Sequence, residues 1–333
     1  MKINVSIKIM SYAVVGVFLL VYFIGIYWSF MPDNINIQQE VTADARAENV
    51  TPVVGYTTTT ALIKVASAIL DKPGGYLSND ALPPGVFLDN MPAWEFGVLE
   101  MVRDMSLVMR KDFSRSQSQS LENEDIKKAQ PKFNIDHESW VMPSAESEYR
   151  KAIASLHDYR NALVGISSNK KSHAQFYARA DNLRAYLDEV QKRLGSYSQR
   201  LSASVGRVQL NTDLAGDNVA QQSSHDASYL QLKTSWWQLD DVFYESRGAA
   251  WALLHFLKAI EIDFDSVLEN KNAKISLQQI IRELEASLET MWSPLVLNGS
   301  GFGLLANHSL VMANYISRAN ASIIDLTELL IKG

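Results

Sequence analysis

The sequence predicts an all-α protein, in which one N-terminal transmembrane helix precedes an elongated multi-helix bundle with long antiparallel, heptad-patterned helices. Three observations predict this class. An uncharged apolar run occupies residues 9–30, apolar residues in the second half recur alternately four and three positions apart, and alternating strand patterns are nearly absent. With 333 residues, 47% of them hydrophobic, the chain is long enough for one large domain or two ordinary ones.

The apolar run from Ile9 to Phe30 has the length of a membrane span. Its 22 residues would form a helix of about 33 Å, close to the thickness of the hydrocarbon core of a bilayer. A cleaved signal peptide is the alternative reading. The run is longer than the usual apolar core of such a peptide, and Trp28-Ser29-Phe30-Met31 offers no small-x-small cleavage site. The sequence therefore predicts an uncleaved anchor that contacts the lipid bilayer.

The charges on either side of this run predict its orientation. Lys2 and Lys8 precede it, whereas acidic residues predominate between Asp33 and Glu48. Positively charged flanks stay in the cytoplasm. We therefore expect residues 1–8 in the cytoplasm, a single pass through a bacterial inner membrane, and the bulk of the chain in the periplasm.

Composition also restricts the partners and the chemistry. The 31 Lys and Arg residues against 37 Asp and Glu give a formal net charge of −6, so nucleic acid is not an expected partner. The chain has no cysteine, and its six histidines are dispersed without metal-ligand spacing. The glycine-rich run at residues 299–303 lacks the strand and the lysine of a nucleotide loop. The sequence therefore predicts no metal and no cofactor.

The exported part divides by composition into three segments. Residues 31–55 are expected to form a linker that leaves the membrane, and residues 56–143 a mixed helix and loop segment with a proline- and glycine-rich stretch at 71–90. Residues 144–333 are expected to form the helical bundle.

Two long helices are predicted within this bundle, at residues 176–208 and 232–264, each about 50 to 60 Å long. Apolar residues spaced 3.5 positions apart on average form a stripe along a helix. This stripe stays in contact with a partner helix only if the two helices wrap around each other left-handedly. The polar stretch at 212–228 is the expected reversal, which would make these helices antiparallel neighbours. Their seam positions are Phe176, Leu183, Leu187, Val190, Leu194, Leu201, Leu232, Trp236, Leu239, Phe243, Leu253 and Leu257.

Two carboxylate groups are the candidates for catalysis. Glu138-Ser139, followed by Pro143, Ala145 and Ser147, is similar to the opening of the catalytic motif of soluble lytic transglycosylases, in which one Glu is the general acid. The glycine-rich continuation of that motif is missing, so the alternative is a loop that begins a helix at Ser144. The second group comprises Asp240, Asp241 and Glu245, near two tryptophans. The alternative interpretation is that these residues belong to a helix that is buried on two faces and has no catalytic role.

Four segments resemble an uncharacterised proteobacterial family, domain of unknown function 2333. They are GGYLSND (residues 74–80), PPGVFLDNMPAWE (83–95), DFSRSQSQS (112–120) and FNIDHESW (133–140). The resemblance covers nearly the whole chain. It implies a Gram-negative inner-membrane protein with one N-terminal span, and it brings no activity and no assigned site residues.

These observations favour a non-enzymatic envelope scaffold or interaction protein of unknown biochemical activity. Its expected partners are the bilayer, through residues 9–30, and either another envelope protein or a second copy of the chain. Two alternatives stay open. One is a membrane-tethered peptidoglycan hydrolase, and the other is an envelope assembly factor or chaperone with an exposed apolar groove.

Overall fold

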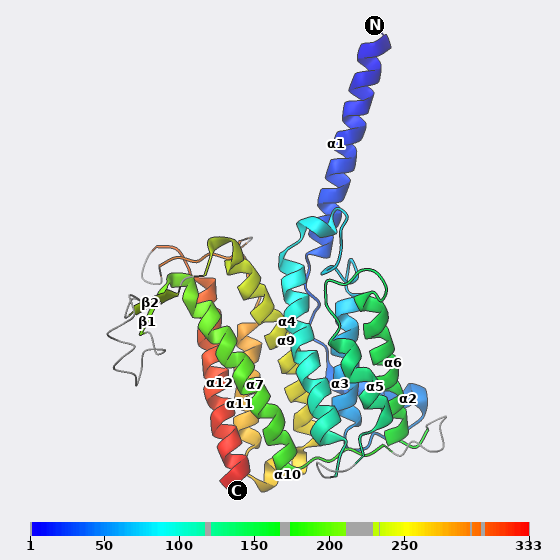
Figure 1. Cartoon of the computed structure of the whole chain (residues 1–333), viewed down its shortest axis with the longest axis vertical. Coiled ribbons are helices and arrows are strands. Elements are labelled where there is room, and N and C mark those ends of the chain that lie inside the picture. Colours follow the sequence, from blue (N-terminus) through cyan, green and yellow to red (C-terminus); the bar gives the residue numbers. More distant parts are fainter. Residues whose placement is uncertain are drawn as a thin grey trace, which may run out of the picture.

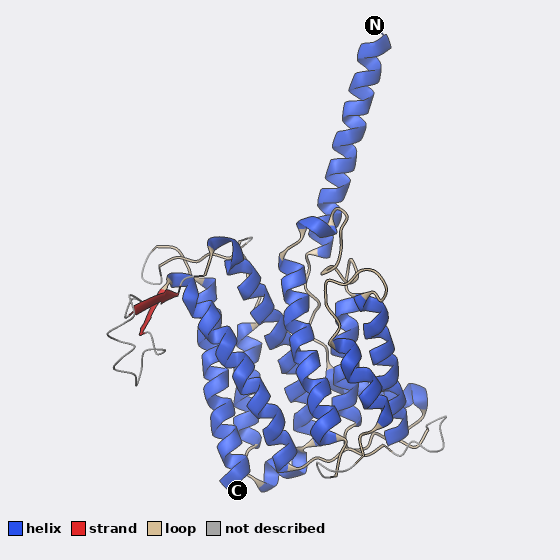
Figure 2. Ribbon diagram, viewed as in Figure 1, coloured by secondary structure: helices blue, strands red, loops and turns tan. Residues whose placement is uncertain are grey.

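The computed structural model describes residues 2–116, 121–166, 174–210, 229–232, 234–293, 295–300 and 304–332. Helices make up nearly all of the regular structure in these ranges, which confirms the predicted all-α multi-helix fold (Figure 2). The helices stand side by side in a broad body, and one long N-terminal helix projects from one end of it (Figure 1).

Helix α1 (Lys2–Trp28) is the projecting helix. Its 21-residue portion Lys8–Trp28 is long and apolar enough to cross a membrane, and only 6% of its most apolar window is buried. The last turns of α1 touch the body, because a Cβ atom added at Gly25 would lie 3.5 Å from Cβ of Pro84. This length and composition are typical of a membrane anchor or of a signal sequence.

The residues after α1 differ from the expected linker. They run back along the body and form helix α2 (Ile37–Glu48), which packs on α3. Asn36 caps α2 by accepting a hydrogen bond from the Gln39 N–H, and Ile37, Val41 and Ala45 bury their side chains. The prediction of a linker over residues 31–55 is therefore wrong for α2, because three apolar residues at helical spacing suffice to dock a short helix.

One side of the body contains α3 (Tyr56–Asp71), α5 (Glu124–Phe133) and α6 (Ala145–Leu163), with α6 packed against both α3 and α5 (Figure 1). The other side contains α7 (Ala180–Ser202), α10 (Asp265–Asn270), α11 (Lys274–Ser287) and α12 (His308–Lys332), with α12 packed against both α7 and α11. Buried residues from both sides belong to one hydrophobic core, so the predicted segments 56–143 and 144–333 share a core.

Helices α4 (Asn90–Val108) and α9 (Leu239–Asp263) join the two sides at the centre of the body (Figure 1). They run in the same direction and cross closely. A Cβ atom at Gly97 would lie 1.9 Å from the backbone oxygen of Glu245, and one at Gly248 would lie 2.0 Å from that of Trp94. Only glycine permits this approach. A wider turn with π-helical hydrogen bonds (Met109–Phe113) extends α4.

The two long predicted helices are shorter than expected and have other partners. Helices α7 and α9 contain 23 and 25 residues, or roughly 35 Å each. Helix α7 packs mainly against α12, whereas α9 packs mainly against α4. The expected reversal between them, at residues 212–228, lies outside the described residues.

A pair of short antiparallel strands replaces the adjoining helix ends. Strand β1 (Arg207–Leu210) pairs with β2 (Tyr229–Leu232), so that Arg207 lies opposite Leu232. Both strands alternate polar and apolar residues, a strand pattern that the helical rhythm concealed. Gly206 ends the helical stretch with a φ of 77°.

Three seam positions therefore lie outside the α-helices, which corrects their assignment. Leu232 is in β2, Trp236 is in a 3-10 turn (Trp236–Gln238), and Phe176 is in the extended segment before α7. The other nine seam positions are helical and buried: Leu183, Leu187, Val190, Leu194 and Leu201 in α7, and Leu239, Phe243, Leu253 and Leu257 in α9.

Candidate functional site

Several loops gather at the end of the body from which α1 projects (Figure 1). They are residues 72–89 before α4, residues 134–144 before α6, the described part of 288–307 between α11 and α12, and residues 235–238 before α9. We call this end the α1-proximal face. It contains most of the segments that carry the family resemblance, so it is the first candidate for a functional surface.

A buried ion pair anchors this face. Lys72 Nζ lies 2.7 Å from Glu95 Oε1, and neither side chain is exposed to solvent. Glu95 also accepts hydrogen bonds from the backbone N–H groups of Leu77 and Ser78 and from the Ser78 hydroxyl. Burial raises the pKa of Glu95, and the Lys72 ammonium opposes this rise. The pair therefore fixes the loop that follows α3 to the first turns of α4.

The glycine pair that follows Lys72 lets α1 approach the loop. Gly74 has a φ of 87°, and a Cβ atom there would lie 2.7 Å from Cγ of Trp28. The same loop is bound to its neighbour, because the Tyr76 hydroxyl donates to the His137 carbonyl oxygen and Asn79 Nδ2 donates to the Ser139 carbonyl oxygen. Residues 74–80 thus connect α1, α4 and the loop at 134–144.

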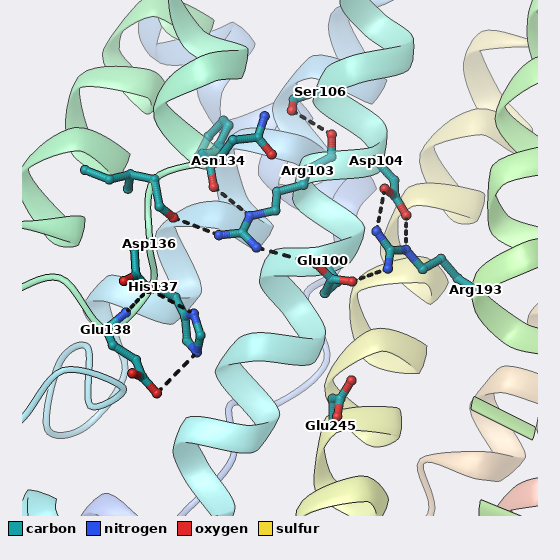
Figure 3. Close-up of polar contacts among 12 residues, drawn as sticks. Glu100, Arg103, Asp104, Ser106, Asn134, Asp136, His137, Glu138, Arg193 and Glu245 are labelled. Carbon is teal, nitrogen blue, oxygen red and sulfur yellow. Dashed lines mark hydrogen bonds and ion pairs between the residues drawn. The ribbon is translucent and has the colours of Figure 1, made fainter. Parts of the chain in front are cut away.

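Glu138 lies on this second loop, and its side chain is 72% exposed. The His137 ring lies beside it, with Nε2 3.9 Å from Glu138 Oε1 (Figure 3), and burial lowers the pKa of His137. The Glu138 N–H donates to Asp136, and the Ser139 hydroxyl donates to the Pro143 carbonyl oxygen, so both contacts stay within the loop at 134–144. Helix α6 begins after Ser144, whose hydroxyl caps it.

Away from this loop, an ionic cluster joins α4 to α7. Arg193 Nε donates to Asp104 over 2.7 Å, and a second guanidinium nitrogen of Arg193 pairs with Glu100 (Figure 3). Arg103 donates to the carbonyl oxygens of Phe133 and Ile135 and, over 3.5 Å, to Glu100 (Figure 3). The carboxylates of Glu100 and Asp104 are therefore balanced by two arginines, Arg103 and Arg193, and the cluster connects α4 to α7 and to the loop after α5.

The second predicted carboxylate group is divided in the structure. Both oxygens of Glu245 accept hydrogen bonds from Arg200, at 2.7 and 2.5 Å. Asp241 instead lines a groove of about 560 Å³ between the end of α7 and the start of α9, together with Arg200 and Gln238. Burial and the neighbouring Asp240 raise the pKa of Asp241 to about 6. The surroundings of Asp241 therefore favour the protonated form of its carboxyl group more than water does.

The sequence pattern missed three buried polar sites. Arg160 extends from α6 to Asp44 and Glu48 of α2, and Asp263 accepts hydrogen bonds from the N–H and the hydroxyl of Thr58. The third is the Lys72–Glu95 pair. In each case the partners lie far apart in the sequence, so neither spacing nor composition signals the pair. Among the described residues, no group of three or more His, Asp or Glu is placed to hold a metal ion.

The fold and these contacts define an all-α protein with a projecting apolar N-terminal helix. Residues 2–333 match the family described as "Uncharacterized protein conserved in bacteria (DUF2333)". The chain therefore belongs to this bacterial family, which confirms the resemblance. No curated protein and no solved structure matches the chain.

Proposed function

We propose that the chain is a single-span inner-membrane protein that holds its helical body in the periplasm and acts by binding other envelope components. The main support for this proposal is that α1 stands away from the body and exposes apolar side chains along most of residues 8–28. Exposed apolar surface of this extent is costly in water and favourable in a bilayer. Lys2 and Lys8, which precede the apolar run, and the acidic residues after it support a cytoplasmic N-terminus.

The described carboxylates support binding more than catalysis. A general acid for glycoside hydrolysis requires an enclosed environment that favours its protonated form, and the Glu138 side chain is largely exposed. Glu100, Asp104 and Glu245 are each bound by an arginine. These arginine pairs contribute to the packing of α4, α7 and α9, which is a structural role.

The proposal is tested by the fate of residues 1–30 in the cell. An anchor predicts that the protein fractionates with the inner membrane, resists extraction by carbonate at high pH, and has the intact mass of 37.3 kDa. A signal sequence predicts a shorter protein that lacks these residues and is recovered in the soluble periplasmic fraction. In-cell crosslinking of the intact protein would then identify a periplasmic partner or a second copy.

A peptidoglycan hydrolase is the second candidate function, and the surroundings of Asp241 favour it. Its raised pKa and its place in the groove beside Arg200 are typical of a proton-transfer site. Purified sacculi incubated with the full chain provide the test. Release of muropeptides by the wild type but not by Asp241→Asn or Glu138→Gln would support the hydrolase and contradict the binding role.

A further inference from the structure

We propose that the α1-proximal face is itself a lipid-binding surface, whose exposed apolar side chains enter the headgroup region of the bilayer that α1 crosses. The inference rests on the proposed function, because it requires α1 to span a membrane. It adds a second contact with the lipid and a fixed orientation of the body. The ligand is the surface of a bilayer rich in zwitterionic phospholipid.

The body contacts α1 within the depth of the membrane span. The span needs about 20 residues to cross the hydrocarbon core, and the apolar portion of α1 ends at Trp28. Pro84 and Leu88 pack against Gly25, which precedes that end by three residues, or about 4.5 Å of helix. The loop at residues 82–88 therefore lies at the level of the last turn of the span. It cannot remain in bulk water while α1 crosses the bilayer.

The loop at this level exposes apolar side chains. Leu82, Val86 and Phe87 belong to the loop that packs on α1, and all three are exposed, Phe87 to 74%. Their burial would be favourable by roughly 25 cal/mol for each Å² of apolar surface removed from water. In an aqueous setting, three exposed apolar residues within six positions would be a liability.

The exposed tryptophans also gather at this end of the body. Six tryptophan side chains are described, and the three exposed ones, Trp140, Trp237 and Trp292, all lie on the α1-proximal face. They come from three different loops: before α6, before α9 and after α11. Tryptophan concentrates at the interface between headgroups and hydrocarbon because its ring is both apolar and a hydrogen-bond donor. Exposed Trp on separate loops at one end of the molecule favours a broad, flat ligand such as a membrane.

Charge selects the type of lipid. The same loops carry Asp80, Asp89, Asp136 and Glu138, and Lys72, the basic residue of the first loop, is fully buried in its pair with Glu95. Acidic side chains are repelled by anionic headgroups. Contact with this face is therefore driven by apolar burial, and it should depend little on salt.

The absence of native cysteine permits a direct test in the full chain. Single substitutions Phe87→Cys, Trp140→Cys and Trp292→Cys place an environment-sensitive fluorophore on the face. Ile275→Cys is the matched control, because Ile275 is 80% exposed but lies at the start of α11, at the opposite end of the body. Val17→Cys, in the middle of α1, reports the span itself. Each labelled protein is reconstituted into phosphatidylethanolamine–phosphatidylcholine vesicles that contain a lipid-attached quencher.

The inference predicts quenching at the three face positions at least twofold stronger than at Ile275, and strongest at Phe87. The exposed side chains replaced here are not part of the core, and circular dichroism checks that each variant is folded. If the Val17 label is quenched by deep quenchers but any face label is quenched no more than the Ile275 label, the inference is overturned and the span stands. If the Val17 label is not quenched either, the proposed function fails as well.

Discussion

Replacement of Lys72 by methionine would test the buried ion pair that anchors the α1-proximal face. The substitution keeps most of the length and the apolar stem of the side chain, and it removes the ammonium that lies 2.7 Å from Glu95. Because both side chains are fully buried, the remaining carboxylate would have no cationic partner and little water. The backbone N–H groups of Leu77 and Ser78 would still donate to it.

The expected cost follows from this burial. Removing one partner of a buried pair destabilises a protein by about 3 to 5 kcal/mol. At roughly 2 °C per kcal/mol for a chain of this size, the melting temperature should fall by about 6 to 10 °C. Lys64→Met, in the helix that precedes Lys72, is the matched control, because Lys64 pairs with Glu40 and Asp44 but is partly exposed. Its loss should cost no more than about 1 kcal/mol.

The assay is thermal denaturation of the full chain in vesicles, followed by circular dichroism at two pH values. Burial already raises the pKa of Glu95, and loss of Lys72 removes the effect that opposes this rise. A carboxyl group with a raised folded-state pKa stabilises the fold when it is protonated, and this contribution is lost as the pH rises through that pKa. The deficit of Lys72→Met should therefore be smaller at pH 5 than at pH 8. An equal deficit in Lys72→Met and Lys64→Met would refute the reasoning.

Three further predictions concern other contacts. Gly248→Ala should lower the free energy of unfolding by about 1 to 3 kcal/mol, because the added Cβ would clash with the backbone of α4. Gly195→Ala should raise it by up to about 1 kcal/mol, because a Cβ atom there meets nothing closer than 3.9 Å. Chemical denaturation measures both variants. Burial lowers the pKa of His255 from 6.5 to about 4. The stability that depends on its neutral ring should therefore be lost as the pH falls from 6.5 to 4. In His255→Gln the melting temperature should change less over this pH range than in the wild type. Arg160→Met should destabilise by about 1.5 to 3 kcal/mol, because it removes charged hydrogen bonds to Asp44, which keeps Lys64, and to Glu48, which keeps only the Tyr56 hydroxyl. The exposed Arg150→Met should cost less than about 1 kcal/mol, and melting temperature measures both.

Local patterns in the sequence predicted the helices that bury one regular stripe. The spacing of Leu183, Leu187, Val190 and Leu194 requires a helix, and α7 has these residues buried. The same pattern does not state which helix covers the stripe. Several helices present similar apolar stripes, so the choice of α12 for α7 and of α4 for α9 depends on close fits such as that at Gly248.

The sequence predicted the site less well than the fold. Glu138 drew notice because a short motif surrounds it, yet its side chain points to solvent beside His137. The Lys72–Glu95 pair went unnoticed because its partners are 23 positions apart and each is common on protein surfaces. Pairing between residues this far apart is determined by the packed fold, and a short sequence pattern cannot predict it.

The most direct test of the central claim is the location of the C-terminus of the intact chain. Alkaline phosphatase, which is active only outside the cytoplasm, and β-galactosidase, which is active only inside it, would each be fused after Gly333. The account predicts high phosphatase activity and low galactosidase activity, and both fusions should lose this pattern when residues 9–30 are deleted. High galactosidase activity with inactive phosphatase in the intact fusions would contradict it.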